Sequence, residues 1–178
     1  MLKRVLLLVV ALCWCITGAA EEPALGPVIE GYGPTYLVDD RQIALADGFV
    51  YKAVFDVASY RGEVTSLNPE LVSVARFLNM HARNGTAPGD MDLAVVVHGA
   101  ALKNLLTHDA YRRRYEVDNP NLALLERLHD AGVRIMLCGQ SMAFGGIDKS
   151  ELASPVEVGL SAMTLLTVLQ SEGYALLP

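Results

Sequence analysis

Five stretches of the chain carry the hydrophobic patterns of β-strands. They cover residues 49–57, 93–97, 133–137, 156–160 and 174–177. In the first stretch, aromatic and apolar side chains occupy alternate positions on one face, whereas Lys52 and Asp56 take the other face. The second and third stretches are unbroken apolar runs, the pattern of parallel strands that are covered on both faces.

Helical spacing of apolar residues separates these strands. The Asn-Pro pair at 68–69 is typical of an N-cap followed by proline at the first helical position, and the helical spacing continues until Gly85. The Asn-Pro pair at 119–120 repeats this signal and predicts a second helix that Gly132 ends. The remaining expected segments are a short helix at 101–107, a polar stretch at 109–117, a loop at 139–147, a capping pair of Asp148 with Glu151, and a helix at 161–172.

Strands that alternate with helices across short connections predict a single α/β domain. Right-handed crossovers then give a mainly parallel, doubly wound sheet of about five strands, flanked by helices. This domain is expected to cover residues 48–178, and residues 21–47, rich in glycine and proline, precede it as an irregular leader. No G-x-G-x-x-G motif or P-loop follows a strand, so the sequence predicts no cofactor.

Residues 1–20 have the pattern of a secretory signal peptide. Lys3 and Arg4 provide the positive start, residues 5–16 are apolar, and small residues lead to an expected cleavage after Ala20. The apolar run is shorter than the roughly 20 residues that span a bilayer, although a retained N-terminal anchor is the alternative. The protein is therefore expected to be periplasmic or secreted, without a membrane span after cleavage.

Composition and charge exclude several classes of protein. Hydrophobic residues make up 52% and charged residues 19% of the chain, which excludes intrinsic disorder. A formal net charge of -6 opposes binding to the phosphates of nucleic acids. No cysteine and histidine spacing typical of zinc ligands occurs, so no metal site is expected. Cleavage would remove two cations along with Cys13 and Cys15, which leaves a charge of -8 and Cys138 as the remaining cysteine.

Two chemically capable side chains, Cys138 and His98, each follow a predicted buried strand. Ligands of open α/β sheets bind beyond the carboxyl ends of the strands, so these two are the candidate catalytic residues. Gly139, Gln140 and Ser141 come next to the thiol, and their backbone N–H groups can form a nest or helix start that stabilises an anion at the sulfur. If the two strands are neighbours, His98 is expected to act as a cationic partner or proton shuttle.

Each of these residues also has a structural interpretation. An unpaired cysteine is often a small buried hydrophobe, and a histidine often ties its ring to loop backbone. The three consecutive residues Arg112, Arg113 and Arg114 could bind an anionic ligand, but a solvated face or a subunit contact fits them better.

Four segments, in their order and spacing, resemble the DsrE/DsrF-like family. They are VVVHG at 95–99, NPNL at 119–122, GVRIMLCGQS at 132–141 and GY at 173–174. The resemblance implies a parallel sheet flanked by helices and a homo-oligomer, often a trimer or hexamer. It also implies sulfur relay, in which a cysteine carries sulfane sulfur as a persulfide, and Cys138 matches that cysteine. Relay proteins of the family are cytoplasmic, whereas this chain has an export signal, so the resemblance transfers the chemistry rather than the pathway.

Three hypotheses about function follow. In the leading one, an exported DsrE-like protein uses the Cys138 thiolate to accept, carry or sense sulfane sulfur that a donor supplies and an acceptor removes. In the second, the chain is a non-enzymatic oligomeric module that binds a small ligand or a protein, and Cys138 only packs. The third is a cysteine hydrolase, which requires Cys138 and His98 to lie within about hydrogen-bond reach.

Overall fold

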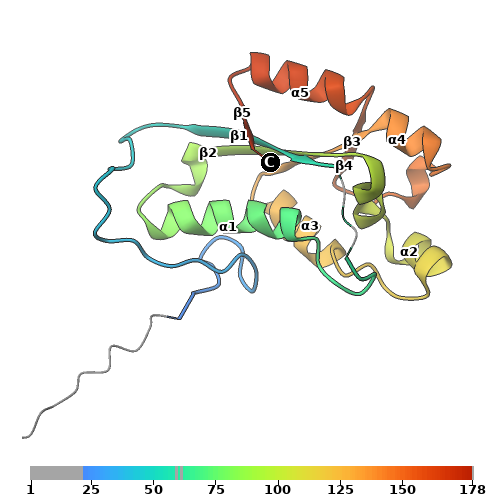
Figure 1. Cartoon of the computed structure of the whole chain (residues 1–178), viewed down its shortest axis with the longest axis horizontal. Coiled ribbons are helices and arrows are strands. Elements are labelled where there is room, and N and C mark those ends of the chain that lie inside the picture. The colour runs from blue at the N-terminus through green and yellow to red at the C-terminus, as the bar shows by residue number, and fades with distance from the viewer. Residues whose placement is uncertain (1–21, 59, 61, 178) are drawn as a thin grey trace, which may run out of the picture.

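The computed structural model describes residues 22–58, 60 and 62–177 (Figure 1). The signal peptide expected at residues 1–20 and its cleavage after Ala20 lie outside these residues. Within the described part of the chain, no helix combines the length and the hydrophobicity needed to cross a membrane.

A five-stranded parallel sheet forms the centre of the domain. Its strands are β1 Tyr51–Val57, β2 Met91–Val97, β3 Arg134–Cys138, β4 Val156–Gly159 and β5 Ala175–Leu177. They lie in the order β4-β3-β2-β1-β5, and every neighbouring pair is parallel. The predicted α/β fold is therefore confirmed, with the two unbroken apolar runs beside each other in the interior of the sheet.

Helices connect these strands. They are α1 Pro69–Arg83, η1 Pro88–Asp90, η2 Gly99–Leu105, α2 His108–Tyr115, α3 Leu122–Asp130, α4 Gly139–Phe144, η3 Lys149–Glu151 and α5 Ala162–Ser171, where η marks a 3-10 helix. The predicted N-cap at Asn68 is confirmed, because its side chain accepts a hydrogen bond of 2.8 Å from the N–H of Glu70. Ser161 caps α5 in the same way, accepting from the N–H of Thr164 at 3.1 Å.

The alternating strand residues divide the core between the two faces of the sheet. Phe55 and Val95 belong to the larger apolar cluster, which includes the buried sides of α1 and α3. Val54 and Val96 point the other way and belong to a smaller cluster under α5, which also contains Cys138. Figure 1 shows this arrangement, with α1 and α3 on one side of the sheet and α5 on the other. The sulfur therefore belongs to the face that a single long helix covers.

Two helices begin where the sequence pattern did not place them. The polar stretch at 109–117 contains α2, which Thr107 caps by accepting from the N–H of Ala110. The Asn-Pro pair at 119–120 does not open α3, which begins at Leu122. The Asn119 amide instead donates to the main-chain carbonyls of residues 104 and 106 and is buried with them.

Two further boundaries differ near the site and at the first strand. The expected loop at 139–147 begins with the helix α4. The first strand begins at Tyr51 rather than at residue 49, because its pairing with β2 starts where Tyr51 faces Met91. Phe49 precedes that pairing and is exposed.

Candidate functional site

The candidate site lies at the carboxyl end of β3, where the strand passes directly into α4. Cys138 is the last residue of β3 and also the N-cap of α4. The backbone N–H of Ser141 donates to its sulfur across 3.5 Å. The three residues predicted to surround the thiol, Gly139, Gln140 and Ser141, thus form the first turn of a helix, one of the two alternatives that the sequence left open.

The Cys138 thiol is surrounded by hydrogen-bond donors. Burial raises the pKa of this thiol, since the residue is only 5% exposed. Hydrogen bonds from the side chain and backbone of Ser141 and from the backbone N–H groups of Ala162 and Gln140 act in the opposite direction. Together these hydrogen bonds outweigh the effect of burial, so the pKa of Cys138 lies below its ordinary value. Because Ala162 is the first residue of α5, the starts of two helices converge on the sulfur.

Ser141 connects the thiol to the end of the neighbouring strand. Its hydroxyl oxygen accepts a hydrogen bond of 2.9 Å from the N–H of Gly99, the residue that follows His98. The same hydroxyl donates to the sulfur of Cys138 and helps to lower the pKa of the thiol. The Gly99 amide therefore fixes the orientation in which the Ser141 hydroxyl can stabilise a thiolate.

Gly139 is required at its position by a close approach of β4. Cys138 faces Gly159 in the pairing of β3 with β4. A Cβ atom on Gly139 would lie 2.6 Å from the carbonyl oxygen of Gly159, closer than side-chain carbon atoms approach backbone oxygen. The absence of a side chain at this residue allows the turn from β3 into α4 to pass beside β4.

His98 directly follows β2, which lies next to β3, the strand of Cys138. Residues 97 and 137 face each other in the pairing of β2 with β3. The His98 ring, however, pairs with Asp56 of β1, its Nε2 lying 2.9 Å from the Asp56 carboxylate, and both side chains are about one-third exposed. Among the contacts of the described residues, none joins His98 to the sulfur of Cys138. The Cys–His pair that a cysteine hydrolase would need is thus not formed.

Two acidic residues beside His98 were not among the predicted site residues. Burial is the main reason that the pKa of Glu70 is raised, and the negative charge of Asp56 raises it further, whereas His98 opposes the shift. The Oε2 atom of Glu70 is buried and makes no hydrogen bond within the described residues. The place of Asp56 near the carboxyl end of β1 could have marked it as a site residue. Glu70 comes close to His98 and Asp56 only because α1 docks against the sheet, which the sequence pattern does not show.

The arrangement supports nucleophilic chemistry at the Cys138 sulfur. Within the described residues, no group of three or more His, Cys, Asp or Glu side chains is placed to hold a metal ion. The donors around Cys138 stabilise a negative charge on its sulfur, and the His98–Asp56 pair can exchange protons at the adjoining strand end. The catalytic assignment of Cys138 and His98 remains a prediction.

Comparison with known proteins identifies a family and a shared fold. A sequence model of the DsrE/DsrF-like family matches residues 52–178. The fold is similar to that of MTH1491, a protein of unknown function from Methanobacterium thermoautotrophicum, with a TM-score of 0.54 and 20% identity over 71% of this chain and 97% of that one. It is also similar to the ychN protein from E. coli, with a TM-score of 0.51 and 18% identity over 71% of this chain and 96% of that one. No protein of curated function matches the chain.

Proposed function

The chain belongs to the DsrE/DsrF-like family, which is associated with sulfur relay, and we propose that its Cys138 takes up sulfane sulfur and holds it as a persulfide. The observation that carries the proposal is the set of donors at the Cys138 sulfur. Ser141, Ala162 and Gln140 together lower the pKa of a thiol whose burial alone would raise it. An ordinary packed cysteine needs no such donors, whereas a thiolate nucleophile does.

The proposed step exchanges one sulfur–sulfur bond for another. The Cys138 thiolate attacks the sulfane sulfur of a polysulfide or of thiosulfate, and a new S–S bond forms at Sγ. The S–S bond of the donor breaks, and a shorter polysulfide or sulfite leaves with its electron pair. The persulfide keeps the negative charge of the thiolate. Because one S–S bond replaces another, the transfer consumes no external oxidant or reductant.

The burial of Cys138 restricts the donors that this mechanism can use. With only 5% of the residue exposed, a small inorganic donor fits the approach better than a persulfide carried on another folded protein. His98 has an indirect role in this proposal, because Asp56 holds its Nε2. It lies at the strand end next to the site, and among the described residues it has no contact with the sulfur.

A packing role for Cys138 is the competing explanation, and one observation favours it. The residue belongs to the apolar cluster under α5, together with Val96 and Met136. In that case the chain would be a binding module, and the hydrogen bonds at the sulfur would serve only to cap α4.

Sulfur uptake can be tested by mass spectrometry of the native protein. After treatment with polysulfide or thiosulfate, we expect a gain of one sulfur atom that a reducing thiol removes and that peptide analysis places on Cys138. The Cys138→Ser variant, treated in parallel, should gain none. Failure of the wild-type protein to form this adduct with either donor would refute the proposal and leave the packing role.

A further inference from the structure

A cavity of about 550 Å³, lined in part by Ser141, lies between η2, the end of α2 and α4. This volume is within the range of small-molecule sites, roughly 300–1,000 Å³. Much of its wall is apolar, and the side chains that provide this surface are Ala100, Leu102, Leu106, Phe144 and Ile147. The cavity therefore suits a molecule with an apolar body.

Lys103 places a positive charge in the wall of this cavity. Its ammonium group lies 5.4 Å from the ring centre of Tyr60 and 5.9 Å from that of Tyr115, within cation–π range. Across the part of the chain that the structure describes, Lys103 forms no ion pair with a carboxylate. Its charge is consequently available to an anion that enters the cavity.

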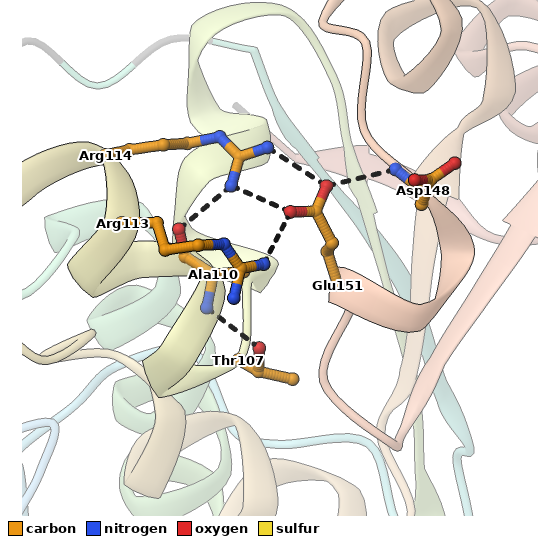
Figure 2. Close-up of polar contacts among 6 residues, drawn as sticks. All are labelled: Thr107, Ala110, Arg113, Arg114, Asp148 and Glu151. Atoms are coloured by element: carbon orange, nitrogen blue, oxygen red, sulfur yellow. Dashed lines mark hydrogen bonds and ion pairs between the residues drawn. The ribbon is translucent and has the colours of Figure 1, made fainter.

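A second positive group, that of Arg114, also lines the cavity. Figure 2 shows Arg113 and Arg114 of α2 both reaching the Glu151 carboxylate, with contacts of 2.8 Å from Arg113 and 3.0 Å from Arg114. Hydrogen bonds from Arg114, from Arg113 and from the backbone of Asp148 lower the pKa of Glu151 to about 2. Glu151 therefore stays ionised at neutral pH and holds Arg114 in the wall of the cavity.

The charges around the cavity do not cancel. Among the described residues that line the cavity, Lys103 and Arg114 are cationic and none is acidic, and Arg114 also pairs with Glu151 behind the wall. The Asp148 carboxylate points away from the guanidinium groups in Figure 2. A positive region on a chain with a net charge of -6 favours the entry of anions over cations.

We propose that this cavity is a binding site for a small organic anion, whose apolar body packs against Leu102 and Leu106 and whose carboxylate or sulfonate group pairs with Lys103. The proposal goes beyond sulfur uptake, since the ligand needs no sulfane sulfur and no reaction at Cys138. Ser141 lines the cavity and also contacts the Cys138 sulfur, so a bound anion would lie one side chain away from the thiol.

The experiment uses hexanoate as the probe, followed by NMR of the ¹⁵N-labelled protein. We expect saturable shifts of amides that line the cavity, those of Gly99, Ala100 and Gly145 among them. Lys103→Gln should weaken hexanoate binding about tenfold, because a charged hydrogen-bonding partner is lost. Lys149→Gln is the matched control, since it removes the same charge from an exposed residue outside the cavity and should leave the affinity unchanged.

Two further measurements distinguish binding of the anion in the cavity from non-specific binding. The neutral analogue 1-hexanol should bind about tenfold more weakly than hexanoate, because it cannot pair with Lys103. Ala100→Trp should block binding while keeping every charge. Equal affinities for the wild type and Lys103→Gln, shifts confined to residues outside the cavity, or the absence of saturable shifts would each overturn the proposal. Because hexanoate cannot transfer sulfur, these results are independent of the chemistry at Cys138.

Discussion

Replacing Asn79 with alanine is expected to release the N-terminal leader from α1 and to lower the free energy of unfolding by about 3 kcal/mol. Asn79 is fully buried on α1, and its carboxamide oxygen accepts from the N–H groups of Val28 and Ile29 at 3.0 and 2.8 Å. Its amide group donates to the carbonyls of Ile29 and Tyr32 at 3.2 and 2.9 Å. One side chain thus satisfies main-chain groups that would otherwise lack partners in the interior.

Urea denaturation and hydrogen exchange would measure this effect. In Asn79→Ala, the Val28 and Ile29 amides should lose their protection, because the acceptor is gone and Ile29 leaves its buried position. Met80→Ala is the control from the same helix, since Met80 is 40% exposed, and its stability should stay close to that of the wild type. Unchanged protection of both leader amides in Asn79→Ala would show that Asn79 does not hold the leader.

Replacing Gly139 with valine is expected to cost about 3 kcal/mol and to disturb the thiol as well. The new Cβ would meet the Gly159 carbonyl oxygen at 2.6 Å, and neither backbone segment can move without shifting β4 from β3. Such a shift would separate Cys138 from the donor at the start of α5. Stability should therefore fall, and the pKa of Cys138 should rise as that donor is lost.

Gly89→Val provides the matched control for this substitution. A Cβ on Gly89 would meet no heavy atom within 4 Å, and the residue lies in η1, away from β3. Urea denaturation and the pH dependence of thiol alkylation should therefore distinguish the two variants. A Gly139→Val protein with wild-type stability and wild-type thiol reactivity would contradict the close packing of α4 against β4.

The sheet and the position of Cys138 could be predicted from the sequence because both depend on local patterns. Unbroken apolar runs identify buried parallel strands, and the residue that follows such a run lies at the edge where ligands bind. The pattern missed α2 because this helix buries only Ala110 and Tyr111, which is too little for a helical period to be seen. The pattern also wrongly placed Asn119 at a helix start. Its side chain instead donates hydrogen bonds to the main-chain carbonyls of residues 104 and 106.

The partners of the candidate site were harder to predict, since they depend on tertiary structure. Ala162 reaches the sulfur because β4 lies next to β3 and carries the start of α5 to the end of that strand. Asp56 meets His98 because β1 lies next to β2 on the opposite side from β3. The strand order decides that His98 is held by a carboxylate and Cys138 by N–H groups, and no local signal gives that order.

The proposed uptake of sulfur requires Cys138 to form a stabilised, reactive thiolate in the folded protein. The pH dependence of its alkylation by iodoacetamide under native conditions tests this most directly, with Ser141→Ala and the exposed control Ser171→Ala measured in parallel. We expect the wild type to react with a pKa below that of an ordinary thiol, and Ser141→Ala alone to shift that pKa upward, because the Ser141 hydroxyl stabilises the anion. Alkylation that occurs only as fast as the protein unfolds, or a pKa that Ser141→Ala does not move, would contradict the claim.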